Sequence, residues 1–252
     1  MNKNAEERVQ KLFVGMKSSL SRTDPEFVEI ISNFSQDETV RASKLTQKEQ
    51  MLCILSALLG CQGMGEFQNM LHAALNMGIE PVAIKEVIYQ AAAYLGIGRI
   101  HDFLVTANQI MEQHGVRLPL LGQATTNEKT RFEEGLAKQI DLFGSDMAKR
   151  QEESSDLRRN INRWLADNCF GDYYTRNGLN DQEREMITFC FLLCSTTLYS
   201  FSLLFPTPKF PAVCPFSWFS QPPCARMPYI GYPRSLNALN IIDEVSERIK
   251  NQ

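Results

Sequence analysis

The sequence predicts an all-α protein made of two related helical units. Apolar residues recur at helical spacing from about residue 45 to residue 111, and nothing in that half shows the alternation of a strand. The motif Leu45-Thr-Gln-Lys-Glu49 recurs as Leu179-Asn-Asp-Gln-Glu183 at an offset of 134, and residues 94–99 recur as residues 229–234 at an offset of 135. Repetition at a nearly constant interval is typical of duplicated units.

Residues 1–44 are expected to form N-terminal helices that pack on the first unit. The second of them opens at Asp24-Pro25, where the aspartate can cap the helix and the proline occupies its first position. Both residue types are favoured at a helix start, so we place the boundary there.

The first unit, residues 45–114, reads as four helices separated by glycine or proline. The first begins at Leu45 and ends at the Gly-Cys-Gln-Gly of residues 60–63. The second spans residues 67–77 and stops at Gly78, and the third follows Pro81. Residues 96–98 (Gly-Ile-Gly) separate it from the fourth.

Residues 115–127 are expected to be a linker, and residues 128–252 the second unit, with helices over 132–147 and 157–165. Within the second unit, residues 196–226 depart from the repeat. They hold six of the eleven prolines and only two charged residues, Lys209 and Arg226. We predict that this Pro-rich segment is non-helical and disrupts the second unit.

Charge and targeting signals exclude several classes of protein. The chain has 26 Lys plus Arg and 29 Asp plus Glu, so we expect no basic surface of the kind that binds nucleic acid. The polar N-terminus lacks a secretory h-region, and seven cysteines without framework spacing suit reduced thiols, so we expect a cytoplasmic protein. Residues 186–208 carry no charge and match the length of a membrane span, but scattered Ser and Thr argue against one.

Four stretches identify a family resemblance: Leu75–Gly78 (Leu-Asn-Met-Gly), Ile84–Gln90 (Ile-Lys-Glu-Val-Ile-Tyr-Gln), Asn168–Arg176 (Asn-Cys-Phe-Gly-Asp-Tyr-Tyr-Thr-Arg) and Tyr229–Arg234 (Tyr-Ile-Gly-Tyr-Pro-Arg). Through them the chain resembles tandem members of the carboxymuconolactone decarboxylase family, in the alkylhydroperoxidase D-like superfamily. The resemblance covers most of residues 45–114, 128–195 and 228–250. It implies two copies of one helical unit in a single chain.

The resemblance also implies a function. It implies lyase or isomerase-type chemistry without metal or organic cofactor, on a small carboxylated, lactone-like substrate, and a ring-like homo-oligomer, a trimer for tandem chains. Such a site must hold a carboxylate, stabilise a developing enolate and deliver a proton to carbon.

In the family, the second unit continues past the position of Cys194 with Gly-Gly, a His and a Gly-Asn-Leu-Asn-Val-Gly-Asn turn, which residues 196–226 lack. We read the complementary strand of codons 206–226 one base out of phase, with TCN codons assumed for Ser217 and Ser220. Read in this way, it encodes a Gly-Gly and a Gly-Asn-(Leu/Phe)-Gly-Val-Gly pattern. We therefore expect inverted DNA here rather than a natural loop, and sequencing the source locus tests this. The first unit has Met70 where the His is expected, so we expect the present form to be inactive.

Candidate catalytic residues follow from the resemblance. Glu49, Glu183 and Glu185 lie near the start of the corresponding helix in each unit, where the family places a site carboxylate, and Glu185 matches better. The alternative for each is a glutamate favoured by the helix dipole. Arg176, with Tyr173, is the candidate clamp for a substrate carboxylate, against the alternative of a surface ion pair.

Two further function classes stay open. The first is a peroxiredoxin-type redox protein that uses Cys61 as a lone thiol, although no Cys-x-x-Cys pair is present and a buried structural thiol is the simpler interpretation. The second is a non-catalytic helical binding module. His72 and His101 fit a surface or packing role better than that of a base. The sequence contains no two pairs of Cys or His at the spacing of a zinc site, so zinc binding is not expected.

Overall fold

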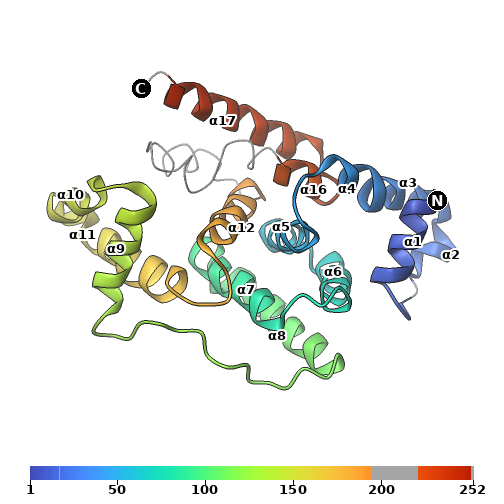
Figure 1. The fold of residues 1–252 in the computed structure, drawn as a ribbon, viewed down its shortest axis with the longest axis horizontal. Coiled ribbons are helices and arrows are strands. Elements are labelled where there is room, and N and C mark those ends of the chain that lie inside the picture. Colours follow the sequence, from blue (N-terminus) through green and yellow to red (C-terminus); the bar gives the residue numbers. More distant parts are fainter. Residues whose placement is uncertain (17, 195–220, 251–252) are drawn as a thin grey trace.

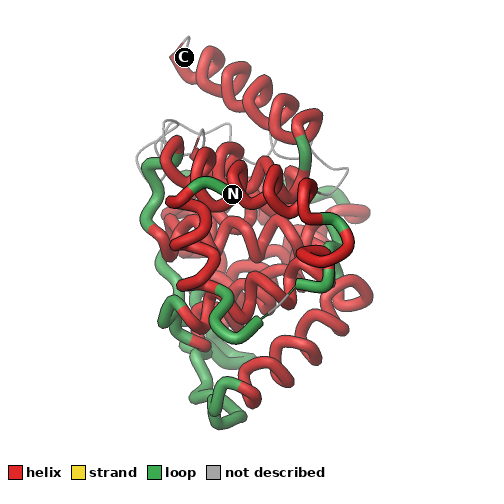
Figure 2. Tube along the Cα trace, turned by 90° about the vertical axis from the view of Figure 1, so that its right-hand side faces the viewer, coloured by secondary structure: helices red, strands yellow, loops and turns green. Residues whose placement is uncertain are grey.

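The computed structural model describes residues 1–16, 18–194 and 221–250, and within these ranges it is helical without any strand (Figures 1 and 2). The predicted all-α class is confirmed. No helix in the described ranges combines the length and the apolar character needed to cross a membrane. The elements are α1 (Lys3–Leu12), α2 (Leu20–Thr23), α3 (Pro25–Asn33), the π-helical η1 (Phe34–Glu38), α4 (Thr39–Ala42), α5 (Gln47–Gly60), α6 (Met64–Asn76), α7 (Pro81–Leu95), α8 (Ile97–Gln113), α9 (Arg131–Phe143), α10 (Asp146–Glu152), α11 (Asp156–Trp164), the π-helical η2 (Leu165–Tyr174), α12 (Asp181–Cys194), α16 (Gln221–Ile230) and α17 (Tyr232–Lys250).

Helices α5, α7 and α12 lie at the centre of the molecule and pack against one another (Figure 1). Almost every residue of α5 beyond its first turn is buried, and so is α12 from Glu183 onward. The two helices approach closely at their C-terminal ends, where a Cβ on Gly60 would lie 2.6 Å from the Cβ of Cys194. The core therefore joins helices from both halves of the sequence.

The N-terminal helices match the expected boundary but not the expected cap. Pro25 opens α3, as predicted. Asp24 stands at the N-cap position, yet its carboxylate accepts a hydrogen bond of 2.6 Å from the Thr23 hydroxyl and caps no helix amide. The backbone of Asp24 is the reason, because φ −137° and ψ 55° depart from the extended conformation usual at an N-cap.

A long stretch without helix joins α8 to α9 and runs along one side of the molecule (Figure 1). Three hydrogen bonds tie it to η2 and the residues that follow. The Thr125 hydroxyl donates to the Thr175 carbonyl at 2.9 Å, and the Thr126 hydroxyl to the Gly171 carbonyl at 2.6 Å. The Asn177 amide donates to the Gln123 carbonyl at 3.0 Å, so the stretch is held beside Arg176.

One part of the Pro-rich prediction is wrong. Residues 195–220 lie outside the described residues, but residues 221–226 belong to α16 and are helical. Pro222 and Pro223 fall in the first turn of that helix, where a missing amide hydrogen leaves no intrahelical bond unmade. Of the uncharged stretch 186–208, residues 186–194 form the buried end of α12.

Helix α9 packs against η2 through two glycines. A Cβ on Gly135 would lie 2.6 Å from the amide nitrogen of Gly171, and a Cβ on Gly171 would lie 2.8 Å from the carbonyl carbon of Arg131. Only glycine permits backbones to approach this closely. This contact fixes η2, the segment that leads into Arg176.

Candidate functional site

A cavity of about 540 Å³ lies between α7, α8 and the stretch that follows α8. Its size suits a small organic ligand. It is lined by Val82, Lys85, Glu86, Tyr89, Asn108, Glu112, Leu118, Pro119, Leu120, Leu121, Gly122, Gln123 and Arg176. Of the residues singled out in the sequence, it contains Arg176, the candidate carboxylate clamp; we call it the Arg176 pocket.

Two arginines share one carboxylate at the wall of the Arg176 pocket. The Arg176 Nε lies 3.0 Å from both oxygens of Glu86, and the Arg184 Nη2 lies 3.2 Å from Oε2 of the same group. Glu86 is 1% exposed and Arg184 0%, whereas the Arg176 side chain keeps 18% of its surface. Two guanidinium groups against one carboxylate leave one positive charge without a partner in this cluster, beside the cavity.

A second cation and an aromatic ring complete the polar wall. The Lys85 ammonium donates to the side-chain oxygen of Asn108 and lies 5.9 Å from the centre of the Tyr89 ring. The Arg176 guanidinium lies 5.3 Å from the same ring. Burial lowers the pKa of Lys85. Glu112 also lines the cavity but is exposed, so water screens its charge.

Behind this wall lies a buried polar network. The Arg184 Nη1 donates to Gln90 at 2.8 Å, and the Gln90 amide donates to the Thr188 hydroxyl at 2.8 Å. The Tyr174 hydroxyl lies 3.0 Å from that of Thr188 and 2.9 Å from that of Tyr94. These contacts join α7, η2 and α12 in one chain of hydrogen bonds that begins at the Arg176 pocket.

Glu185 sits beside this network. It is 1% exposed, and burial raises its pKa to about 8, partly offset by a hydrogen bond with Tyr174. Its Oε1 has no hydrogen-bond partner among the described residues. A carboxyl with this pKa holds its proton at neutral pH, which is the state that a general acid requires.

The other predicted glutamates cap helices instead. Glu49 accepts a hydrogen bond of 2.7 Å from the Thr46 amide in a capping box at the start of α5. Glu183 accepts one of 3.0 Å from the Asn180 amide at the start of α12 and also pairs with Lys48 at 2.6 Å. Both positions agree with the alternative interpretation of a helix-start glutamate.

Tyr173 and Cys61 lie apart from the Arg176 pocket. Tyr173 is half-buried and does not line it, whereas its neighbour Tyr174 belongs to the buried network. Cys61 donates to the Leu58 carbonyl at 3.7 Å, and burial raises the pKa of its thiol. A raised pKa is the opposite of what a reactive lone thiol needs.

A different cysteine has the more activated environment. The Nη1 of Arg226 lies 2.7 Å from the sulfur of Cys190. Burial alone would raise the pKa of Cys190, but a hydrogen bond from Cys53 and the Arg226 charge lower it, while burial raises the pKa of Cys53. Both Cys190 and Arg226 are 0% exposed, so this pair is shielded from solvent.

Several residues of the site were not among the predicted site residues, namely Glu86, Gln90, Tyr94 and Arg184. A signal existed for the first three, because they are spaced by four and share one face of α7, a polar stripe on a helix of mostly buried residues. In the described ranges, no three His, Cys, Asp or Glu side chains come together in a way that could hold a metal ion.

Part of the chain is similar to a known family. Residues 25–117 match the model of the carboxymuconolactone decarboxylase family. Among solved structures, a Burkholderia xenovorans protein provisionally named as a gamma-carboxymuconolactone decarboxylase subunit aligns at 15% identity and a TM-score of 0.45, over 98% of this chain and 92% of that one. No curated protein matches significantly. The match to the family model thus spans residues 25–117, which include α7 and its polar stripe.

Proposed function

We propose that the chain binds a small carboxylated, lactone-like molecule in the Arg176 pocket. We further propose that its fold is one that supports cofactor-independent lyase or isomerase-type chemistry. We also propose that the present form is inactive. The observation that carries the proposal is the sharing of Glu86 by Arg176 and Arg184, which leaves a positive charge beside the cavity.

An incoming carboxylate would neutralise that excess charge. The planar Arg176 side chain is suited to bidentate pairing with a carboxylate, and it is the more exposed of the two arginines. Lys85 adds a second cation on the same wall, and the Tyr89 ring offers a flat apolar surface against which a lactone ring can pack. The pocket therefore meets the first need of the chemistry, which is to hold a carboxylate.

The second need, a proton delivered to carbon, is not met by Glu185, the carboxyl with the raised pKa. Loss of carbon dioxide leaves an electron pair that a neighbouring carbonyl takes up as an enolate, which must then be protonated. Glu185 holds a proton at neutral pH, but neither it nor Tyr174 lines the pocket. The arginine cluster lies between the pocket and Glu185 along the polar network. This arrangement favours binding without turnover in this form.

Calorimetric titration with muconolactone, a five-membered lactone bearing a carboxylate side chain, tests the proposal. Arg176→Met should weaken binding at least tenfold, because a charge-assisted pair is lost while Glu86 keeps Arg184 as its partner. Arg159→Met is the matched control, since Arg159 pairs with Asp156 at 2.7 Å within α11 and does not line the pocket. Equal affinity in the two variants would contradict the proposed clamp, and carbon dioxide release by the wild type from gamma-carboxymuconolactone, which carries an additional carboxylate, would contradict inactivity.

The family context also favours a two-unit chain, with units at 45–114 and 128–252, that assembles into a cytoplasmic homotrimer. Helix α11 supports assembly, because Leu157, Ile161 and Trp164 share one face and are 92%, 58% and 58% exposed. Sedimentation velocity distinguishes a trimer from a monomer.

The redox alternative is disfavoured by the raised pKa of Cys61.

A further inference from the structure

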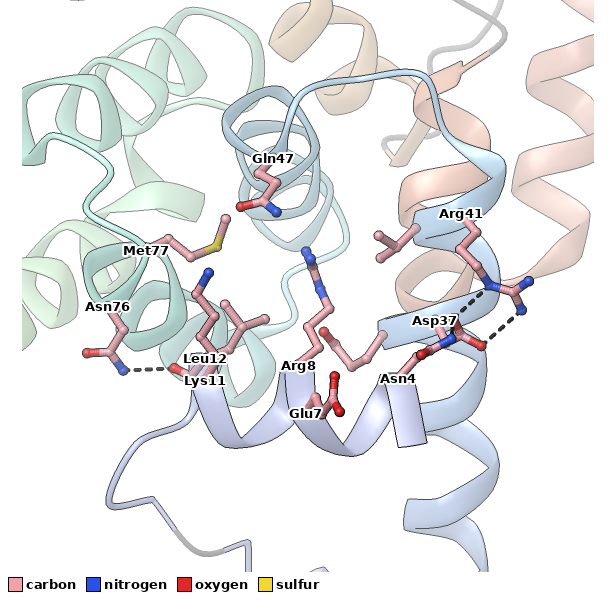
Figure 3. A pocket seen from close by; sticks show the side chains of 12 residues that line it. Asn4, Glu7, Arg8, Lys11, Leu12, Asp37, Arg41, Gln47, Asn76 and Met77 are labelled. Carbon is pink, nitrogen blue, oxygen red and sulfur yellow. Dashed lines mark hydrogen bonds and ion pairs between the residues drawn. The ribbon is translucent and has the colours of Figure 1, made fainter. Parts of the chain in front are cut away.

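We propose that a second cavity, formed by α1 against η1, α4, α5 and α6, binds a small organic carboxylate through Arg8 and Lys11 (Figure 3). Its volume is about 410 Å³. The cations face an apolar surface contributed by Leu12, Val40 and Met77, and two amides, Gln47 and Asn76, also line the cavity. We call it the Arg8 pocket.

The two cations lie on successive turns of α1. In Figure 3 both side chains rise from α1 into the cavity, toward Gln47. Within the described ranges neither Arg8 nor Lys11 forms an ion pair with an acidic side chain. The buried Nε of Arg8 has no hydrogen-bond partner there either. Burial lowers the pKa of Arg8, and only the Tyr229 hydroxyl acts in the other direction.

The acidic side chains that line the Arg8 pocket are engaged elsewhere. Asp37 accepts hydrogen bonds from Arg41 at 2.7 and 2.9 Å and from Asn2 and Asn4 at 3.1 and 3.3 Å. Figure 3 shows the Asp37–Arg41 pair at the edge of the cavity. Glu7 lies 3.8 Å from Lys3 on the exposed side of α1. Within the described ranges, therefore, neither of these carboxylates forms an ion pair with Arg8 or Lys11.

The composition of the cavity indicates the ligand class. A half-buried arginine with an unused Nε–H, next to a lysine, is a strong site for an anion. An inorganic anion would leave the surface of Leu12, Val40 and Met77 uncovered, whereas a carboxylate with a short apolar body would bury it. We therefore assign an organic carboxylate rather than phosphate.

The Arg8 pocket is separate from the Arg176 pocket. The two cavities share no lining residue. Helix α1, which supplies both cations, precedes residues 25–117, the part that matches the family model. The proposed site thus takes both of its cations from outside the matched residues, and it does not depend on the proposed function.

Benzoate, a carboxylate with a compact apolar body, is the probe, titrated into the Arg176→Met chain so that the Arg176 pocket does not contribute. Calorimetry gives the affinity, and the side-chain Nε–Hε resonance of Arg8 reports contact at that nitrogen. We expect saturable binding with a shift of this resonance. Benzamide, which has the same shape without the charge, should not bind, and inorganic phosphate should bind at least tenfold more weakly than benzoate.

Arg8→Gln should weaken benzoate binding at least tenfold and Lys11→Gln several-fold, whereas Arg22→Gln, at an exposed arginine of α2, should leave it unchanged. No saturation at millimolar benzoate, or equal affinity in Arg8→Gln and Arg22→Gln, would overturn the site. Phosphate binding as tightly as benzoate would overturn the ligand class. If Arg8→Gln does not fold, the Arg8 resonance in the chain with an intact α1 still decides, and its failure to shift would overturn the proposal.

Discussion

Glu185→Gln should remove most of a large pH dependence of stability that the wild type shows between about pH 5 and pH 8. The pKa of Glu185 rises from 4.5 to about 8 on folding, chiefly because the carboxyl is buried. The folded state therefore binds this proton more tightly than the unfolded state does. This proton therefore adds to the free energy of unfolding. The contribution is fully present below the unfolded pKa of 4.5 and is lost as the pH rises through about 8.

The size of this effect follows from linkage. Each unit of pKa difference corresponds to about 1.4 kcal/mol, so the shift of Glu185 amounts to roughly 5 kcal/mol across the window. Urea unfolding between pH 4.5 and pH 9 measures it as the difference between wild type and Glu185→Gln. Glu112→Gln, at an exposed carboxylate, is the control and should keep the wild-type slope. Parallel curves for wild type and Glu185→Gln would show that Glu185 ionises normally in the fold.

The helices of the first half were predictable because single residues near each helix end determine where that helix begins or stops. Pro81 opens α7 and Gly96, with φ 79°, ends it, while Gly78, with φ 77°, follows α6. Each signal acts through the backbone of one or two residues, so neighbouring sequence is sufficient to locate it. The helical start of α16 was missed because prolines were weighed by number, whereas position within the first turn decides their effect.

The site was less predictable, because its key contacts join residues far apart in the chain. Arg176 pairs with Glu86 across 90 positions, and Arg184 with Gln90 across 94. No local pattern specifies such partners. Glu185 was predicted as a site carboxylate, but its raised pKa depends on burial in the packed core, which only the structure shows. By contrast, the capping role of Glu49 was readable, since Thr46-x-x-Glu49 is the capping-box signature.

Gly171→Ala should be among the most destabilising single substitutions in the chain. The added Cβ would lie 2.8 Å from the carbonyl carbon of Arg131 and closer still to its oxygen. The opposing group is backbone, so relief requires α9 and η2 to move apart rather than a side chain to rotate. We expect a loss of at least about 3 kcal/mol, and a similar loss for Gly135→Ala, measured by urea unfolding.

The matched control is Gly98→Ala in α8, where an added Cβ meets nothing within 4 Å. Alanine is the better helix former, so this variant should be neutral or stabilised by up to about 1 kcal/mol. Muconolactone titration adds a second readout, because Gly171 lies five residues before Arg176 in a segment that its contact with α9 holds in place. Gly171→Ala should therefore lose binding under conditions in which Gly98→Ala retains it. Wild-type stability and affinity in Gly171→Ala would mean that α9 and η2 do not pack through these glycines, and that the position of Arg176 is set by other contacts.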